Sequence, residues 1–332
     1  MRRPRTVVLL VLLATLAFAA AARPNLKKTY FRLGNPSDAV TTTRPGTVLM
    51  GGSTDVDAAF AWLCERAGQG DFLVVRATGT DAYNPYVQQL CPGIHSVATL
   101  IVDSDEFADS AFVREVVDAA EVVWIAGGDQ SDYIVEWTGT GLQAGIAAHV
   151  ADGGPVGGTS AGLAVLTQFV YSALASQGVT SSQALADPYN KYVTLARDFL
   201  AVPGLEDTIG DTHFVPRDRM GRTLAFMCRI HANGWSVAPR AIAVDEETAL
   251  LINERGVATV VGSNAAYFLS APGAPEACAP ATPLTYRNVA VRRVGPGGTF
   301  DVGDWRGSSG TTYAVTAEAG VLTSTQPGGS AY

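Results

Sequence analysis

Short apolar runs alternate with segments of helical composition in the first half of the chain. The runs cover residues 47–50, 72–77, 97–102 and 122–126. Segments of helical composition follow them at residues 55–64, 83–90, 109–120 and 143–150. This alternation predicts βαβ units and hence an α/β fold around a mainly parallel sheet. Because ligands of such folds bind at the carboxyl ends of the strands, polar residues directly after each run are the first candidates for a site.

The pattern changes in the second half of the chain. A polar stretch at 172–192 predicts a loop with a short helix, and residues 191–199 have helical composition. Short apolar runs separated by turn residues then predict an antiparallel extension of the sheet. These runs lie at residues 241–244, 248–252, 257–261, 267–269, 289–294 and 300–302. We expect the last residues, 321–332, to form a flexible tail.

The first residues have the composition of a secretory signal peptide. Arg2, Arg3 and Arg5 precede an apolar run at 6–16 and a run of small residues at 17–22. The apolar run is short for a transmembrane helix. We therefore expect residues 1–22 to be a signal peptide, 23–44 an N-terminal arm and 45–320 a single α/β domain. The protein would be secreted or periplasmic, with no membrane association after cleavage.

Composition narrows the class of partner. The chain has 332 residues, of which 47% are hydrophobic, and its net charge of −8 argues against binding to nucleic acid.

The even number of cysteines predicts one or two disulfides in an oxidising compartment. Three complete pairings are open, and proximity in sequence favours Cys64–Cys91 with Cys228–Cys278. No cysteine or histidine has metal-ligand spacing, so neither a metal nor another cofactor is predicted.

A serine among small residues follows the next apolar segment. Gly158-Thr159-Ser160-Ala161-Gly162 fits the G-x-S-x-G nucleophile elbow, in which a serine stands on a sharp strand-to-helix turn. Glycines suit such a turn because they adopt backbone angles that other residues resist. The N–H groups that open the following helix can stabilise an oxyanion. Ser160 is therefore the candidate nucleophile, and the alternative interpretation is a glycine-rich connector.

A serine nucleophile needs a base and an acid that orients it. Position favours His213 as the base, because His95, His149 and His231 each have a structural explanation. The orienting acid stays open among four residues, Asp211, Asp245, Glu246 and Glu247.

Two further segments carry candidate binding residues. Gly127 and Gly128 end the fourth apolar run, and Gln130 follows with both a donor and an acceptor. The alternative for this segment is a helix N-cap at Asp129. Later in the chain, Pro216 can sit in the first turn of a helix. Arg219 and Arg222 would then oppose the helix dipole on one face, which suggests an anionic partner, with solvated arginines as the alternative.

Four motifs together resemble the cyanophycinase family of serine peptidases, peptidase family S51. The motifs occur in the family's order, and the resemblance spans roughly residues 45–305. The four motifs are Gly127-Gly128-Asp129-Gln130, Gly158 to Gly162, Asp211-Thr212-His213-Phe214 with Arg217, Arg219 and Arg222, and Ala243-Val244-Asp245-Glu246. The resemblance implies a class I glutamine amidotransferase-like (flavodoxin-like) fold, with a mainly parallel sheet sandwiched by helices and an antiparallel C-terminal extension.

The resemblance also implies roles for individual residues. Ser160 would be the nucleophile, His213 the base and Glu246 the orienting acid, with an oxyanion hole from the N–H groups of Gly128 and Ala161. Substrate would be held by six residues, Gln130, Asp211, Thr212, Arg217, Arg219 and Arg222. The family commonly has glutamine at the position of Thr212, which puts the dipeptide specificity in question. The implied substrate is cyanophycin, a poly-aspartate with arginine on each side chain, cut to β-aspartyl-arginine dipeptides.

Three other functions stay open. The first is an aspartyl dipeptidase with the same catalytic residues, whose partner would be an aspartyl dipeptide rather than an acidic-backbone polymer. The second is an α/β-hydrolase esterase, which would use Asp207 and His231. The third is a secreted binding protein without catalysis. Homodimerisation also stays open.

Overall fold

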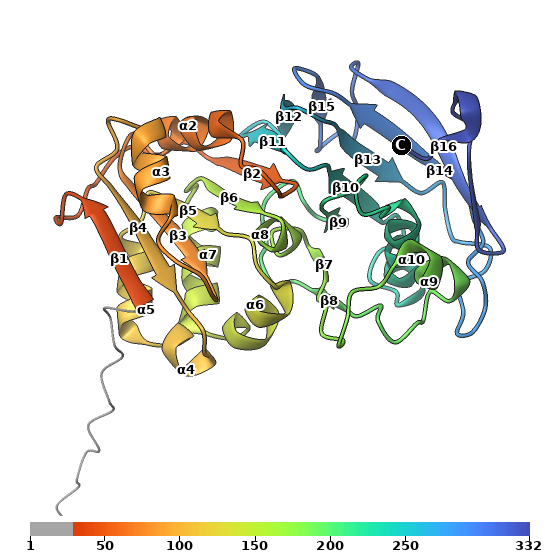
Figure 1. The fold of residues 1–332 in the computed structure, drawn as a ribbon, viewed down its shortest axis with the longest axis horizontal. Helices are drawn as coiled ribbons and strands as arrows, with labels where there is room; N and C mark the ends of the chain where they lie inside the picture. Colours follow the sequence, from red (N-terminus) through yellow and green to blue (C-terminus); the bar gives the residue numbers. More distant parts are fainter. Residues whose placement is uncertain (1–28) are drawn as a thin grey trace, which may run out of the picture.

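The computed structural model describes residues 29–332, and the expected signal peptide lies outside the described residues. The fold is mixed α/β and contains two sheets, which lie next to each other in Figure 1. Sheet A has nine strands and carries most of the first half of the chain, whereas sheet B has eight strands. The α/β class was predicted correctly, but the division of the later strands between two sheets was not.

Sheet A has a parallel centre with antiparallel strands on both sides. Its five central strands run parallel in the order β4-β3-β5-β6-β2. In spatial order the strands are β1 (Tyr30–Gly34), β4 (Ser96–Ile101), β3 (Asp71–Arg76), β5 (Val122–Ile125), β6 (Val156–Thr159), β2 (Gly46–Met50), β11 (Thr248–Asn253), β12 (Val257–Gly262) and β15 (Thr299–Asp301). The central strands are buried on both faces, which explains their continuous apolar sequence.

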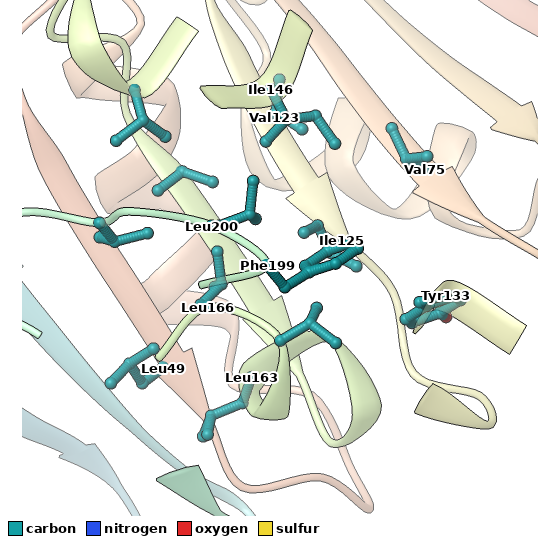
Figure 2. Packing of buried hydrophobic residues seen from close by; sticks show 14 of the residues in the cluster. Leu49, Val75, Val123, Ile125, Tyr133, Ile146, Leu163, Leu166, Phe199 and Leu200 are labelled. Atoms are coloured by element: carbon teal, nitrogen blue, oxygen red, sulfur yellow. The ribbon is translucent and has the colours of Figure 1, made fainter. Parts of the chain in front are cut away.

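Helices cover both faces of the parallel centre. Trp124 of β5 packs against Phe60, on the face covered by α2 (Asp57–Arg66) and α3 (Tyr83–Leu90). Val123 and Ile125 point to the other face, where Figure 2 shows Val123 beside Ile146 of α7 (Gly141–Ala151) and Ile125 beside Phe199. The remaining helices of this half are α4 (Asp105–Ala108), α5 (Ala111–Asp118), α6 (Gln130–Trp137) and α8 (Ala161–Ala164).

Sheet B combines a small parallel part with an antiparallel meander. In spatial order its strands are β17 (Val321–Ser324), β16 (Thr311–Glu318), β14 (Tyr286–Val294), β13 (Ala266–Ser270), β10 (Arg240–Val244), β9 (Thr208–Asp211), β7 (Phe169–Tyr171) and β8 (Leu195–Arg197). One core packs it against the helices α9 (Ser181–Ala186) and α10 (Met220–Ala232). A short 3₁₀ helix, η1, spans Pro327–Gly329.

Three expectations for this half were wrong. The stretch 191–199 is not a helix, because its residues 195–197 pair with β7 and form β8. Pro216 lies in a turn before α10, which begins only at Met220. The expected tail at 321–332 instead supplies β17, and the hydroxyl of Tyr332 bonds Asp218 and the N–H of Met220.

Both disulfides join the cysteines that are nearest in sequence, as predicted. Cys64–Cys91 connects α2 to the end of α3 with 6.3 Å between the Cα atoms. Cys228–Cys278 connects α10 to the loop before β14 with 6.1 Å between the Cα atoms. Among residues 29–332, no helix is both long and apolar enough to cross a membrane.

Candidate active site

Ser160 stands on a strained turn between β6 and α8. Its backbone angles are φ 52° and ψ −113°, a conformation that costs free energy for a residue with a side chain. A Cβ on Gly158 would lie 2.5 Å from the carbonyl carbon of Gly162, and one on Gly162 would overlap the carbonyl of Ile125. The turn therefore closes only because both positions are glycine. The N–H of Ser160 donates to the carbonyl of Met50 at 3.0 Å, which fixes the serine against β2.

Ser160, His213 and Glu246 form one hydrogen-bonded row. The Oγ of Ser160 lies 2.8 Å from Nε2 of His213, and the Nδ1 of His213 lies 2.6 Å from Oε1 of Glu246. The His213 side chain is only 7% exposed, and that of Glu246 is 25% exposed. In this arrangement His213 can take a proton from Ser160 while Glu246 holds the ring and stabilises the imidazolium.

The neighbouring acids have different contacts. The carboxylate of Asp245 accepts the backbone N–H groups of Glu246 at 2.9 Å and Val215 at 3.3 Å. It thus ties the turn that bears Glu246 to the residues after His213. Glu247 is exposed. Glu246 is the carboxylate that reaches His213, which resolves the choice that the sequence left open.

Two glycines after β2 support the histidine, a role that was not predicted from the sequence. The N–H of His213 donates to the carbonyl of Gly51 at 2.9 Å. Gly52 has φ +104°, and a Cβ there would overlap the imidazole of His213. A Cβ on Gly51 would overlap the backbone of Asp245. A glycine pair after a strand is common in turns, so only the three-dimensional contact reveals that it holds the base.

The surroundings of His213 favour its neutral form. Burial lowers the pKa of the imidazole, and the positive charges of Arg217 and Arg219 lower it further. The hydrogen bond that the ring of His213 donates to the carboxylate of Glu246 raises this pKa but does not cancel the lowering. A neutral imidazole near neutral pH is the form that can accept the proton of Ser160.

Two backbone N–H groups beside Ser160 are available to an oxyanion. Gly127 lies close to the serine, because a Cβ on it would be 3.5 Å from the Cβ of Ser160. Gly128 follows it, and Ala161 is the first residue of α8. Neither the N–H of Gly128 nor that of Ala161 donates to an acceptor within residues 29–332. These groups fit the part of an oxyanion hole.

The segment around Gln130 has a structural role as well as a position near the site. The carboxylate of Asp129 accepts the N–H of Ser131 at 2.9 Å and caps α6, as the alternative interpretation expected. The side-chain amide of Gln130 donates to the carbonyl of Tyr171 at 3.1 Å, which links α6 to β7.

The structure corrects the binding roles expected of Asp211 and Arg222. Asp211 is 2% exposed and Arg222 5% exposed, and they form a bidentate ion pair at 2.5 and 3.0 Å. Thr223 also donates to Asp211 at 2.8 Å. Burial alone would raise the pKa of Asp211, but Arg222, Arg219 and Thr223 together hold it below its usual range. The anion that the arginines face is therefore this buried carboxylate.

The other two arginines differ in accessibility. Arg219 lies 3.5 Å from Asp211 and donates to the carbonyl oxygen of Thr212 at 2.7 Å and to its hydroxyl at 3.0 Å. Burial lowers the pKa of Arg219 to about 10. Thr212 is itself buried, and its hydroxyl accepts the hydrogen bond from Arg219. Arg217 is exposed and remains the arginine most accessible to a substrate.

The remaining histidines take part in other contacts. His95 pairs with Asp71 at 2.8 Å, and His149 bonds the carbonyl of Pro155 at 3.0 Å. His231, the base required by an esterase arrangement, lies at the end of α10, and the partner of Ser160 is His213 instead. Among residues 29–332, no three His, Cys, Asp or Glu side chains form a metal-binding group.

Comparisons with known proteins point to peptidases. Residues 50–186 match the model of Peptidase family S51. This segment contains Ser160 and the loop at Gly128, and it ends before His213 and Glu246.

Two solved structures are similar. One, of a peptidase from an acI-B1 Actinobacterium, has a TM-score of 0.50 at 18% identity and covers 68% of this chain and 91% of that one. The other, of a protein proposed to be a peptidase E from Listeria monocytogenes EGD-e, has a TM-score of 0.41 at 13% identity and covers 66% and 98%. No curated protein matches the chain. The first likeness supports the fold.

Proposed function

We propose that the chain is a secreted serine peptidase that hydrolyses cyanophycin to β-aspartyl-arginine dipeptides. The observation that carries the proposal is the row from Ser160 through His213 to Glu246, with distances of 2.8 and 2.6 Å. The match of residues 50–186 to peptidase family S51 supports the peptidase class. The substrate rests on the sequence resemblance and on the positive charge beside the site.

The geometry suggests a mechanism with an acyl-enzyme. Ser160 Oγ would attack the scissile carbonyl carbon while its proton passes to Nε2 of His213. The oxyanion would accept hydrogen bonds from the N–H groups of Gly128 and Ala161. His213 would then give the proton to the leaving amine, and the C–N bond would break. A water molecule, deprotonated by His213, would hydrolyse the ester and restore Ser160.

A second candidate is an aspartyl dipeptidase with the same catalytic row. The observation that favours it is the burial of Asp211 with Arg222, because this pair removes one of the three expected arginines from the substrate surface. Arg217 and Arg219 remain, and one arginine fork is sufficient for a single carboxylate. A small cationic surface fits a dipeptide at least as well as a polymer.

One experiment separates the candidates. Purified protein is incubated with insoluble cyanophycin and, separately, with aspartyl dipeptides, beside a Ser160→Ala control. Dipeptide products released from cyanophycin by the wild type alone support the first candidate, and cleavage of dipeptides alone supports the second. If the wild type releases nothing that the control does not, both peptidase proposals fail.

Export is a separate part of the proposal and rests on residues 1–22 only. The two disulfides are compatible with it, because such bonds persist in oxidising compartments. N-terminal sequencing of the protein recovered from the culture medium or periplasm would test export. A mature N-terminus close to Ala19 or Ala22 is expected, and an intact Met1 in the cytoplasm would contradict it.

A further inference from the structure

A cavity lined in part by the loop that follows Gly52 has no role in the mechanism proposed for the catalytic residues. It has a volume of about 430 Å³ and is lined by the loop between β2 and α2, the start of α2, the end of β3 and α3. Its lining consists of Thr54, Asp55, Asp57, Arg76, Ala82, Tyr83 and Tyr86. It therefore lies at the carboxyl ends of parallel strands, where α/β folds place their ligands.

The chain connects this cavity directly to the base. Gly52 packs against the ring of His213, and Thr54 and Asp55 follow it by two and three residues. Met50, just before this loop, accepts the N–H of Ser160. Residues 50–55 thus contact Ser160 and His213 at one end and line the cavity at the other.

The walls of the cavity carry aromatic rings held in place. Phe60 contacts both tyrosines, with its ring centroid 5.8 Å from that of Tyr83 and 5.2 Å from that of Tyr86. Trp124 lies 6.5 Å from Tyr83, is fully buried, and its indole N–H has no hydrogen-bond acceptor within residues 29–332. The tyrosine rings therefore need little further ordering when a ligand binds.

Each tyrosine stands beside a carboxylate. The hydroxyl of Tyr86 donates to Asp57 at 2.6 Å, and Tyr83 and Asp55 line the cavity together. The cavity's own cation, Arg76, donates to the carbonyls of Thr78 at 2.5 Å and Thr80 at 3.0 Å. The cavity thus has two carboxylates and only one arginine, which is already hydrogen-bonded to backbone carbonyls, so its net charge is negative.

We propose that this cavity binds the guanidinium side chain of a substrate residue next to the scissile bond. A guanidinium pairs with carboxylates through planar hydrogen bonds and stacks on tyrosine rings, and the cavity offers both. The inference rests on the proposed peptidase function. It assigns a binding place to the arginine side chains of the substrate, which Arg217, Arg219 and Arg222 cannot bind because they carry the same charge. Burial raises the pKa of Asp55, and a bound cation would offset the cost of its ionisation.

Asp57 also has a structural explanation, because it lies in the first turn of α2, where a negative charge is favourable. That explanation predicts an effect on stability that is the same with every ligand. The proposed role predicts instead an effect that depends on the charge of the ligand, so ligand charge is the variable to test.

The test measures binding rather than turnover. Ser160→Ala protein is titrated calorimetrically with β-aspartyl-arginine and with β-aspartyl-citrulline, a neutral isostere. We expect arginine to bind at least about tenfold tighter, since a close charged pair can be worth 1.4 kcal/mol or more. In Ser160→Ala carrying Asp55→Asn and Asp57→Asn, the ratio of the two dissociation constants should fall to near one. The matched control is Glu65→Gln, which removes an exposed charge from the same helix α2 and should leave the ratio unchanged.

The outcomes separate the two proposals. Equal binding of the arginine and citrulline ligands, or a ratio that the double substitution leaves intact, overturns the subsite whatever the hydrolysis assay gives. Absence of Ser160-dependent hydrolysis overturns the peptidase but leaves the binding result valid. Should the double variant fail to fold, Asp57→Asn alone, at an exposed position, must still lower the ratio.

Discussion

The serine half of the site and the histidine half are held by different forces. Ser160 is fixed by backbone sterics, since Gly158 and Gly162 leave no room for a side chain on either side of the turn. His213 follows Asp211, whose buried ion pair with Arg222 joins β9 to α10. The serine half should therefore be sensitive to added volume, and the histidine half to the loss of charge.

The halves meet at few contacts. Ser160 bonds His213 across the join, and the loop at Gly51 and Gly52 touches the histidine from the side of sheet A. Glu246 lies in the turn from β10 of sheet B to β11 of sheet A. Substitutions at these contacts test whether the two kinds of support combine into one catalytic unit.

The largest expected effect comes from Glu246→Gln. The amide preserves shape but cannot stabilise the imidazolium, and it can hold the ring in the wrong tautomer, so kcat should fall by about 10³ to 10⁴-fold. The measurement is steady-state hydrolysis of the best substrate. Glu247→Gln, an exposed neighbour, is the matched control and should retain activity. Equal losses in both variants would argue against Glu246 as the orienting acid.

Asp211→Asn should mainly reduce stability. It leaves Arg222 buried without its carboxylate, and breaking a buried pair in this way costs about 3–5 kcal/mol. Denaturant unfolding should show the loss, and Arg217→Gln, at an exposed arginine, should unfold like the wild type. A normal unfolding free energy for Asp211→Asn combined with a raised KM would restore the substrate role that the sequence suggested.

The linkage sign follows from the lowered pKa of Asp211. A carboxyl whose pKa is lower in the folded state stabilises the fold above its unfolded pKa, and this contribution is lost as pH falls through the folded value. Asp211→Asn should therefore show a weaker loss of stability on acidification than the wild type.

Features that depend on residues close together in the sequence could be predicted, whereas features that depend on contacts between distant segments could not. The strands β3 to β5 were recognisable because buried parallel strands have continuous apolar sequence, and Ser160 because its glycines are two residues away. Strands β7 and β8 are three residues each, too short for a pattern, and their pairing partners lie in other segments. The second sheet could not be foreseen for this reason.

The same limit applied to the charges. Arg222 pairs with a carboxylate eleven residues earlier, on another element, so sequence spacing suggested an external anion. Asp245, Glu246 and Glu247 are consecutive, and only the path of the turn between β10 and β11 determines which of them points at His213. The geometry of chain segments distant in sequence decided both points.

Gly52→Ala tests the join from the side of sheet A. The added Cβ would overlap the imidazole of His213, and a displacement of about 1 Å can cost about 10²-fold in rate. The loss should appear in kcat. Gly139→Ala is the matched control, because Gly139 also has a positive φ, +79°, but a Cβ there has no neighbour within 4 Å. Both variants share the backbone strain, so a similar kcat in the two would refute a specific contact with His213.

The smallest effect is a shift of the pH profile in Arg217→Gln. The guanidinium disfavours the imidazolium and thereby lowers the pKa of His213, so its removal should raise that pKa. Activity requires the neutral imidazole, and the acid limb of kcat/KM against pH should therefore move to higher pH. Arg255→Gln, an exposed arginine after β11, is the control and should leave the limb in place. The pH profile reports the ionisation of His213, whereas KM reports the interaction with substrate. An unchanged acid limb with a raised KM would therefore limit the role of Arg217 to substrate binding. A shifted acid limb would show that the charge of Arg217 tunes the pKa of His213, which accepts the proton of Ser160.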